Sequence, residues 1–199
     1  MQKIYFYILA FFSCLACVGQ NHPIYSFSAS GHFGFILPHH ADMRYLINSH
    51  VPGGEINFFK PPKKSSDENK CIFYVPERGI GVLFFDLGNP EQLGKGIAFS
   101  PYFNFKINRS EKFNLMLRVG SGIGYVTKPF DRLSNHKDNV IGSHLNGFMN
   151  MRLNTCLNFS NIFRMDAGIG IAHFSNGAVK LPNLGINIVT VNLGFALGF

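Results

Sequence analysis

Residues 164–175 read RMDAGIGIAHFS and residues 185–199 read GINIVTVNLGFALGF, and both stretches alternate between two kinds of side chain. In the first stretch, the odd-numbered positions up to 171 are apolar, whereas the even-numbered positions before them are small or charged. In the second, the odd-numbered positions from 189 onward are apolar, and the even-numbered ones are Thr, Asn, Gly or Ala. This period of two residues predicts two β-strands, each with one apolar face and one small or polar face.

Six further alternating runs precede these two, and Gly, Pro, Asn and Asp residues separate them. The full set of expected strands is Phe27–Leu37, Gly54–Lys60, Gly79–Leu87, Ile97–Ile107, Phe113–Tyr125, Ser143–Thr155, Arg164–Ser175 and Gly185–Phe199. In the third run the two faces look alike. Eight runs of roughly ten residues predict an all-β fold, an eight-stranded antiparallel transmembrane β-barrel of the bacterial outer membrane.

A soluble β-sandwich also has alternating strands, but three features favour the barrel. Arg118, Arg152 and Asp166 fall on the glycine-rich face, where we expect them to pair inside a polar lumen. The opposite face is an almost unbroken apolar surface, longer than a soluble sheet edge safely exposes. The sequence ends on Phe199, and a final aromatic residue resembles the signal read by the outer-membrane barrel-assembly machinery. Closure of the sheet also pairs every backbone group in lipid.

The first 19 residues have the pattern of an export signal. Lys3 precedes the apolar run Ile4–Phe12, and cleavage is expected after Gly19 or, alternatively, after Ala16. Cys17 allows lipoprotein processing as a further alternative. Residues 20–199 then form a single barrel domain, and they contain no apolar stretch long enough for a membrane helix.

Cysteine usage and charge limit the remaining possibilities. Cys71 and Cys156 are the cysteines of the mature chain. The sequence leaves open whether they form a disulfide. No Cys or His pair has metal-ligand spacing and no carboxylate cluster suits calcium, so neither a metal nor another cofactor is expected. The chain carries 18 Lys and Arg against 11 Asp and Glu, without a nucleic-acid-binding motif. This balance fits anionic lipid headgroups rather than nucleic acid.

The lengths of the connections orient the barrel. With both termini in the periplasm, we expect long outward loops and short periplasmic turns. The long outward segments are Pro38–Gly53 and Thr127–Gly142, the short periplasmic ones are Asn108–Lys112 and Leu157–Asn161, and Pro61–Arg78 is a long exception. His173 and Ser175 therefore reach the outer rim on the apolar, lipid-facing wall.

The residues around this point resemble a known active-site signature. The segments His173-Phe174-Ser175-Asn176-Gly177, Lys180, Pro182-Asn183 and Gly185-Ile186 resemble those of the PagL-type lipid A 3-O-deacylases, an outer-membrane acyloxyacyl hydrolase-like family. The motif covers about the last 30 residues, and residues 122–130 are also similar to that family. The resemblance implies a serine esterase that modifies lipopolysaccharide by removing the acyl chain at position 3 of lipid A.

The resemblance also implies a role for each residue. Ser175 corresponds to the nucleophile and His173 to its general base, and Asn187 occupies the position of the family's acid. An Asn carbonyl can hold the imidazole tautomer but supplies no negative charge. Either the geometry survives with a slower reaction, or a different carboxylate assists. Asn183 corresponds to the oxyanion-hole asparagine, and the second donor is a backbone N–H of Asn176, Gly177 or Ala178.

Other polar residues in the outward loops have simpler explanations. Lys128, Arg132, Lys137 and Lys180 are either partners for the lipid A phosphates or ordinary solvated charges. Solvation explains His39, His40, His50, His136 and His144. Two functions from different classes remain: a lipid A deacylase, or a non-catalytic barrel with a structural, adhesion or stress role, in which Asn187 marks a decayed triad.

Overall fold

The computed structural model describes residues 24–61, 75–108, 110 and 113–199. The predicted signal peptide and Cys71 lie outside the described residues. The elements are β1 (Ser26–Ile36), η1 (Ala41–Leu46), β2 (Val51–Lys60), β3 (Glu77–Asp86), β4 (Lys95–Lys106), β5 (Phe113–Val126), β6 (Leu145–Asn158), β7 (Phe163–Ser175) and β8 (Ile186–Gly198). No helix in this part of the chain is long and apolar enough to span a membrane.

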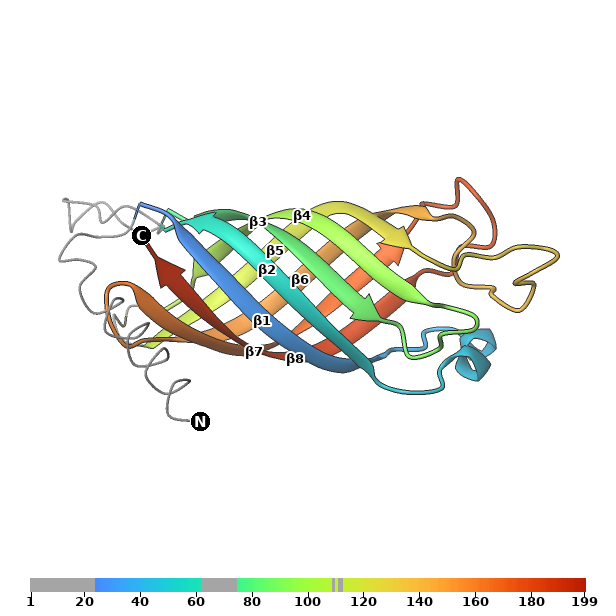
Figure 1. Cartoon of the computed structure of the whole chain (residues 1–199), viewed down its shortest axis with the longest axis horizontal. Coiled ribbons are helices and arrows are strands. Elements are labelled where there is room, and N and C mark those ends of the chain that lie inside the picture. Colours follow the sequence, from blue (N-terminus) through green and yellow to red (C-terminus); the bar gives the residue numbers. More distant parts are fainter. Residues whose placement is uncertain (1–23, 62–74, 109, 111–112) are drawn as a thin grey trace, which may run out of the picture.

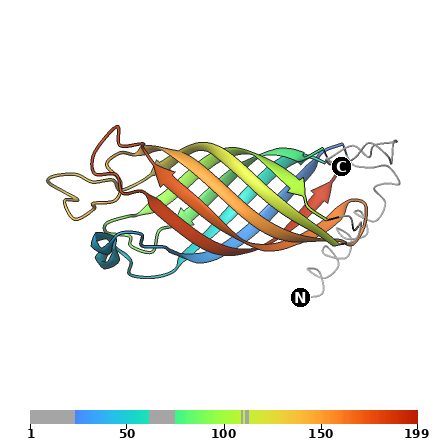
Figure 2. The same cartoon turned by 180° about the vertical axis from the view of Figure 1, so that it is seen from behind.

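The eight strands form one closed antiparallel barrel, as the sequence predicts. Each strand pairs with its neighbours in sequence, and β1 pairs with β8 to close the sheet, from Ser26 opposite Gly198 to Ile36 opposite Ile188. Figures 1 and 2 show the tilted strands from two sides, with the C-terminus and the start of β1 at one end. The other end carries residues 37–50, 87–94, 127–144 and 176–185, and is called the loop end below.

The strand boundaries differ from the predicted ones by up to three residues. β2 begins at Val51 rather than Gly54, because Val51, Pro52 and Gly53 pair with the end of β1. Cross-strand pairing overrides the turn preference of Pro and Gly there. In β3, whose faces look alike in the sequence, Ile80, Val82 and Phe84 point outward and Leu83 and Phe85 point inward.

Charged side chains fill the middle of the lumen, but their pairing differs from our expectation. Glu55 on β2 has a fully buried side chain and forms ion pairs with Arg118 on β5 (2.6 Å) and Arg152 on β6 (2.5 Å). His32 lies 3.0 Å from the same carboxylate. Asp166, the expected partner of the arginines, pairs instead with Arg164 at 2.9 Å. Closure of the barrel brings β2 opposite β5 and β6, which no local pattern reveals.

At the loop end the lumen is apolar rather than polar. Phe85, Phe148 and Phe174 are fully buried there, with Phe148 and Phe174 ring centroids 4.8 Å apart. Met43 and Leu46 of η1 belong to the same hydrophobic cluster. Phe174 lies between His173 and Ser175 in the sequence, so its burial inside the barrel holds those two side chains on the outer wall.

Candidate active site

His173 and Asn187 meet on the lipid-facing wall, at the loop end of two neighbouring strands. They are directly opposite each other in the register of β7 and β8, and both are half-buried. Opposed residues of an antiparallel pair share a face and lie close together. His173 Nδ1 is 2.6 Å from Asn187 Oδ1. This contact fixes the plane of the imidazole ring and leaves its Nε2 atom facing away from Asn187.

Two hydrogen-bond donors converge on Ser175. The Gly177 N–H donates to Ser175 Oγ at 3.2 Å, and Asn183 Nδ2 donates to the same atom at 2.9 Å. The Asn183 amide is itself held, because the Asn176 N–H donates to its Oδ1 at 3.0 Å. Asn176 therefore positions Asn183, and its backbone N–H is already used, whereas Ala178 supplies neither of the two donors to Ser175. An oxyanion hole also needs two such donors, but they must reach the carbonyl oxygen of a substrate rather than the serine hydroxyl that they bind in this structure.

No hydrogen bond joins His173 to Ser175 in the described part of the chain. The two residues are two positions apart on β7, about 6.6 Å along an extended strand. Ser175 Oγ instead lies 3.3 Å from Asn183 Oδ1, close enough to donate to it. Catalytic hydrogen bonds are often loose without substrate and tighten in the reacting complex. A general base at His173 would therefore require the Ser175 side chain to turn away from Asn183.

The turn between β7 and β8 owes its shape to residues with left-handed backbone. Gly177 and Ala178 have φ of 65° and 62°, and Gly185 has φ of 82°. A Cβ atom at Gly185 would lie 2.8 Å from His173 Cε1, so only glycine lets the chain pass so close to the imidazole. The Gly185 N–H also donates to Val140 O at 3.0 Å, which ties the turn to the 127–144 loop.

The structure adds a residue that sequence analysis assigned to loop solvation. His39 Nδ1 lies 3.0 Å from Asn187 Nδ2, and His39 Nε2 lies 2.8 Å from the Leu184 carbonyl oxygen. His39 follows β1, and the Leu37 N–H donates to the Asn187 carbonyl at 2.8 Å where β1 meets β8. Odd numbering places His39 on the same side as Phe35 and Leu37. The odd position number of His39, combined with the pairing of β1 and β8, could therefore have predicted that His39 lies near Asn187.

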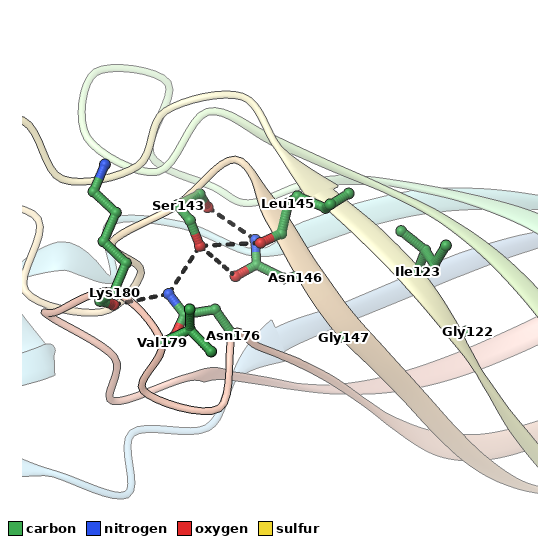
Figure 3. Close-up of a pocket in the computed structure, with 9 residues that line it drawn as sticks. All are labelled: Gly122, Ile123, Ser143, Leu145, Asn146, Gly147, Asn176, Val179 and Lys180. Carbon is green, nitrogen blue, oxygen red and sulfur yellow. Dashed lines mark hydrogen bonds between the residues drawn. The ribbon is translucent and has the colours of Figure 1, made fainter.

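A groove of about 520 Å³ lies at the loop end of β5 and β6, next to the turn that follows β7 (Figure 3). Gly122, Ile123, Leu145, Gly147 and Val179 give it apolar walls, and Ser143, Asn146, Asn176 and Lys180 lie at its polar end. Gly147 on β6 is directly opposite Ser175 on β7. Its missing side chain leaves open space next to the serine, since a Cβ there would meet only the Ser175 carbonyl oxygen, at 3.3 Å. The groove therefore adjoins the strand position of Ser175 through Gly147 and Asn176, although Ser175 itself does not line it.

The candidate cations occupy different positions around this groove. Lys180 lines it, and Figure 3 shows its side chain extending away from the bonds between Asn176 and Ser143. Lys128 Nζ donates to the Glu91 carbonyl at 3.3 Å, so it also ties two loops together. Arg132 and Lys137 are exposed on the 127–144 loop. Cys156 is buried, and the described residues contain no cluster of three or more His, Cys, Asp or Glu side chains that could hold a metal ion.

His144, which the sequence analysis assigned to loop solvation, packs on the barrel instead. Its Nδ1 lies 2.9 Å from the Val126 carbonyl oxygen, and its ring stacks on Tyr125 with centroids 5.3 Å apart. His40 Nδ1 lies 3.5 Å from Asp42 Oδ2, and both side chains are exposed.

Comparisons with known proteins agree with this architecture. A family model described as Lipid A 3-O-deacylase (PagL) matches residues 29–196. The crystal structure of Neisserial surface protein A (NspA) superposes with a TM-score of 0.59 at 9% identity, covering 88% of this chain and 97% of that one. The crystal structure of the outer membrane enzyme PagL superposes with a TM-score of 0.53 at 15% identity, covering 86% and 99%. At such identities the two structures show the fold alone.

A search of curated proteins gives no match. The family model, however, spans most of the chain and contains every residue of the site described above. This protein is therefore a bacterial outer-membrane β-barrel that belongs to the lipid A 3-O-deacylase (PagL) family.

Proposed function

We propose that this protein hydrolyses the 3-O-linked acyl chain of lipid A, with Ser175 as nucleophile, His173 as general base and Asn187 as the residue that orients His173. One observation carries the proposal: on a lipid-facing wall, Asn187 holds His173 at 2.6 Å while two donors converge on the adjacent Ser175. A structural rim of polar residues needs no such convergence on a single hydroxyl oxygen.

The proposed reaction follows the chemistry of serine esterases. Ser175 Oγ attacks the ester carbonyl carbon while His173 Nε2 accepts the hydroxyl proton. The Gly177 N–H and Asn183 Nδ2 then donate to the oxyanion of the tetrahedral intermediate. His173 returns the proton to the sugar oxygen as the C–O bond breaks, and water, with His173 again as base, releases the fatty acid from Ser175.

The location of the site suits a lipid substrate. Lipid A would reach the wall by lateral diffusion in the outer leaflet, with its acyl chain in the groove lined by Ile123, Leu145 and Val179. Under this proposal, the loop end of the barrel faces the outside of the cell. Lys180, with Lys128 and Arg132, would then lie at the level of the lipid A phosphates, where charge-assisted hydrogen bonds are strong. Phe199, paired through its backbone with Tyr25, would be read by the barrel-assembly machinery.

Mass spectrometry of lipid A tests the proposal. Expression in a bacterium of known lipid A structure should remove one hydroxyacyl chain, and Ser175→Ala should abolish the loss. Ser49→Ala is a matched control, because this loop hydroxyl donates to the carbonyl of the neighbouring His50. Unchanged lipid A in cells that contain folded wild-type barrel would contradict the proposal.

The second candidate function is a non-catalytic barrel. Two observations favour it: Asn187 stands where the family's acid is expected, and Ser175 bonds to Asn183 rather than to His173. Asn187→Glu separates the two functions. A faster deacylation in this variant indicates an Asn that acts in a weakened triad, whereas no activity in either protein favours the non-catalytic barrel.

A further inference from the structure

We propose that His39 is a positioning residue that orients the Asn187 amide, so that an asparagine can replace the acid of the triad. The inference rests on the proposed function, but its structural part can be tested without it. An Asn side chain offers one acceptor and two donors, and the two ends of its amide have almost the same shape. Only one of its two orientations supports a general base at His173.

The hydrogen-bond pattern can be followed from a group whose role is fixed. The Leu184 carbonyl oxygen can only accept, so His39 Nε2, 2.8 Å away, must carry the proton. In neutral His39 the Nδ1 atom is then an acceptor. The atom of Asn187 that faces it at 3.0 Å must be the donor, Nδ2.

The same reasoning continues to His173. With Nδ2 directed at His39, Asn187 Oδ1 faces His173 Nδ1 at 2.6 Å and requires a proton there. His173 Nε2 is then unprotonated and free to accept the Ser175 proton, which is the tautomer a general base needs. In the opposite orientation, Nδ2 would face His173, place the proton on Nε2 and remove the base.

His39 acts by opposing that flip. A flipped amide would set Asn187 Oδ1 against His39 Nδ1, two acceptors with no proton between them, and would lose a hydrogen bond. A carboxylate at position 187 has two acceptor oxygens and needs no such control. The dependence on His39 is therefore specific to asparagine at this position.

A double-mutant experiment tests this dependence. We expect His39→Ala to lower kcat for lipid A deacylation by about three- to tenfold with little change in KM, because one hydrogen bond biases the amide. In the Asn187→Asp background, which keeps the side-chain size, the same His39→Ala change should alter kcat less than twofold, as follows from the two equivalent acceptors. His40→Ala is the matched control and should leave both backgrounds unchanged.

An equal loss in both backgrounds would show that His39 merely holds the loop to Leu184, and would overturn the inference. If neither wild type nor Asn187→Asp deacylates lipid A, the proposed function fails, and the orientation is decided by NMR alone. Histidine labelled with ¹⁵N, in barrels folded in detergent micelles, should show His39 protonated on Nε2 and His173 protonated on Nδ1. In His39→Ala, His173 should show a mixture of tautomers. A His39 ring protonated on Nδ1 alone, or a His173 tautomer unchanged by His39→Ala, would refute the positioning role.

Discussion

At the scale of single residues, Gly185 is as closely tied to the site as the side chains themselves. Gly185→Ala would place a Cβ 2.8 Å from His173 Cε1 in a backbone with φ of 82°. We expect the imidazole to be displaced and deacylation to fall by about 100-fold, as misplacement by 1 Å does in other enzymes. The rate of lipid A deacylation measures the effect.

The control for this change is Gly31→Ala, a glycine in β1 with no atom within 4 Å of its hypothetical Cβ. It should leave the rate unchanged. The heat-dependent shift of folded barrels in gel electrophoresis should show that both variants fold. A Gly185→Ala protein with wild-type activity would mean that the His173 ring does not need this close packing.

Among the elements, β6 lines the groove through Leu145, Asn146 and Gly147, and Gly147 lies opposite Ser175. Gly147→Leu would fill the space beside the serine and obstruct an acyl chain. We expect deacylation of lipid A to fall by tenfold or more, in the range set by burial of a few apolar carbons. Hydrolysis of a short, water-soluble ester should change little.

Met151→Leu, four residues further along the outer face of β6 and opposite Ile171, conserves volume and is the matched control. Equal losses on lipid A and on the short ester in Gly147→Leu would indicate damage to Ser175 rather than obstruction of the groove.

The 127–144 loop contains a carboxylate whose burial makes it pH-dependent. Asp138 is fully buried, its Oδ1 accepts the Val140 N–H at 2.8 Å, and its Oδ2 has no hydrogen-bond partner among the described residues. Burial raises the pKa of Asp138 to about 6. The folded loop therefore binds a proton more tightly than the unfolded loop does. Its stability is highest below pH of about 4 and falls by up to about 3 kcal/mol as the pH rises through 6.

Limited proteolysis measures this effect as the ratio of cleavage rates of wild type and Asp138→Asn. Wild type should be cut faster than the variant at pH 8, and the difference between the two rates should narrow at pH 5 and vanish only near pH of about 4. A ratio that stays constant between these pH values would contradict a buried, proton-binding Asp138.

For the whole molecule, the ion cluster around Glu55 joins β2, β5 and β6 across the lumen. Glu55→Ala would leave the buried Arg118 and Arg152 without their carboxylate. We expect the free energy of unfolding to fall by about 3–5 kcal/mol, as for other buried pairs that lose one partner. Urea unfolding of the barrel in detergent provides the measurement.

Glu91→Ala removes the same charge from an exposed loop and should change the free energy of unfolding by less than about 0.5 kcal/mol. Similar losses in both variants would mean that net charge, rather than the buried cluster, decides stability. The cluster lies away from the groove, so deacylation by folded Glu55→Ala protein should persist.

The alternation of side chains was enough to predict the architecture and the wall on which the site lies. A strand places successive residues on opposite faces, so parity along β7 and β8 puts His173, Ser175 and Asn187 on one side without any knowledge of the rest of the chain. The even number of runs and their turn residues predicted the closed sheet. Boundaries were less accurate, because pairing with β1 extends β2 through Pro52 and Gly53.

What the sequence by itself determined, then, is which face each residue occupies, because that depends only on local periodicity. Only the tertiary structure decided which residues meet: Glu55 with the arginines, the phenylalanines that close the lumen beneath the loops, and His39 with Asn187. These contacts join residues up to 148 positions apart. They depend on the register of eight strands and on the closure of β1 against β8, which are properties of the complete barrel and of no single segment.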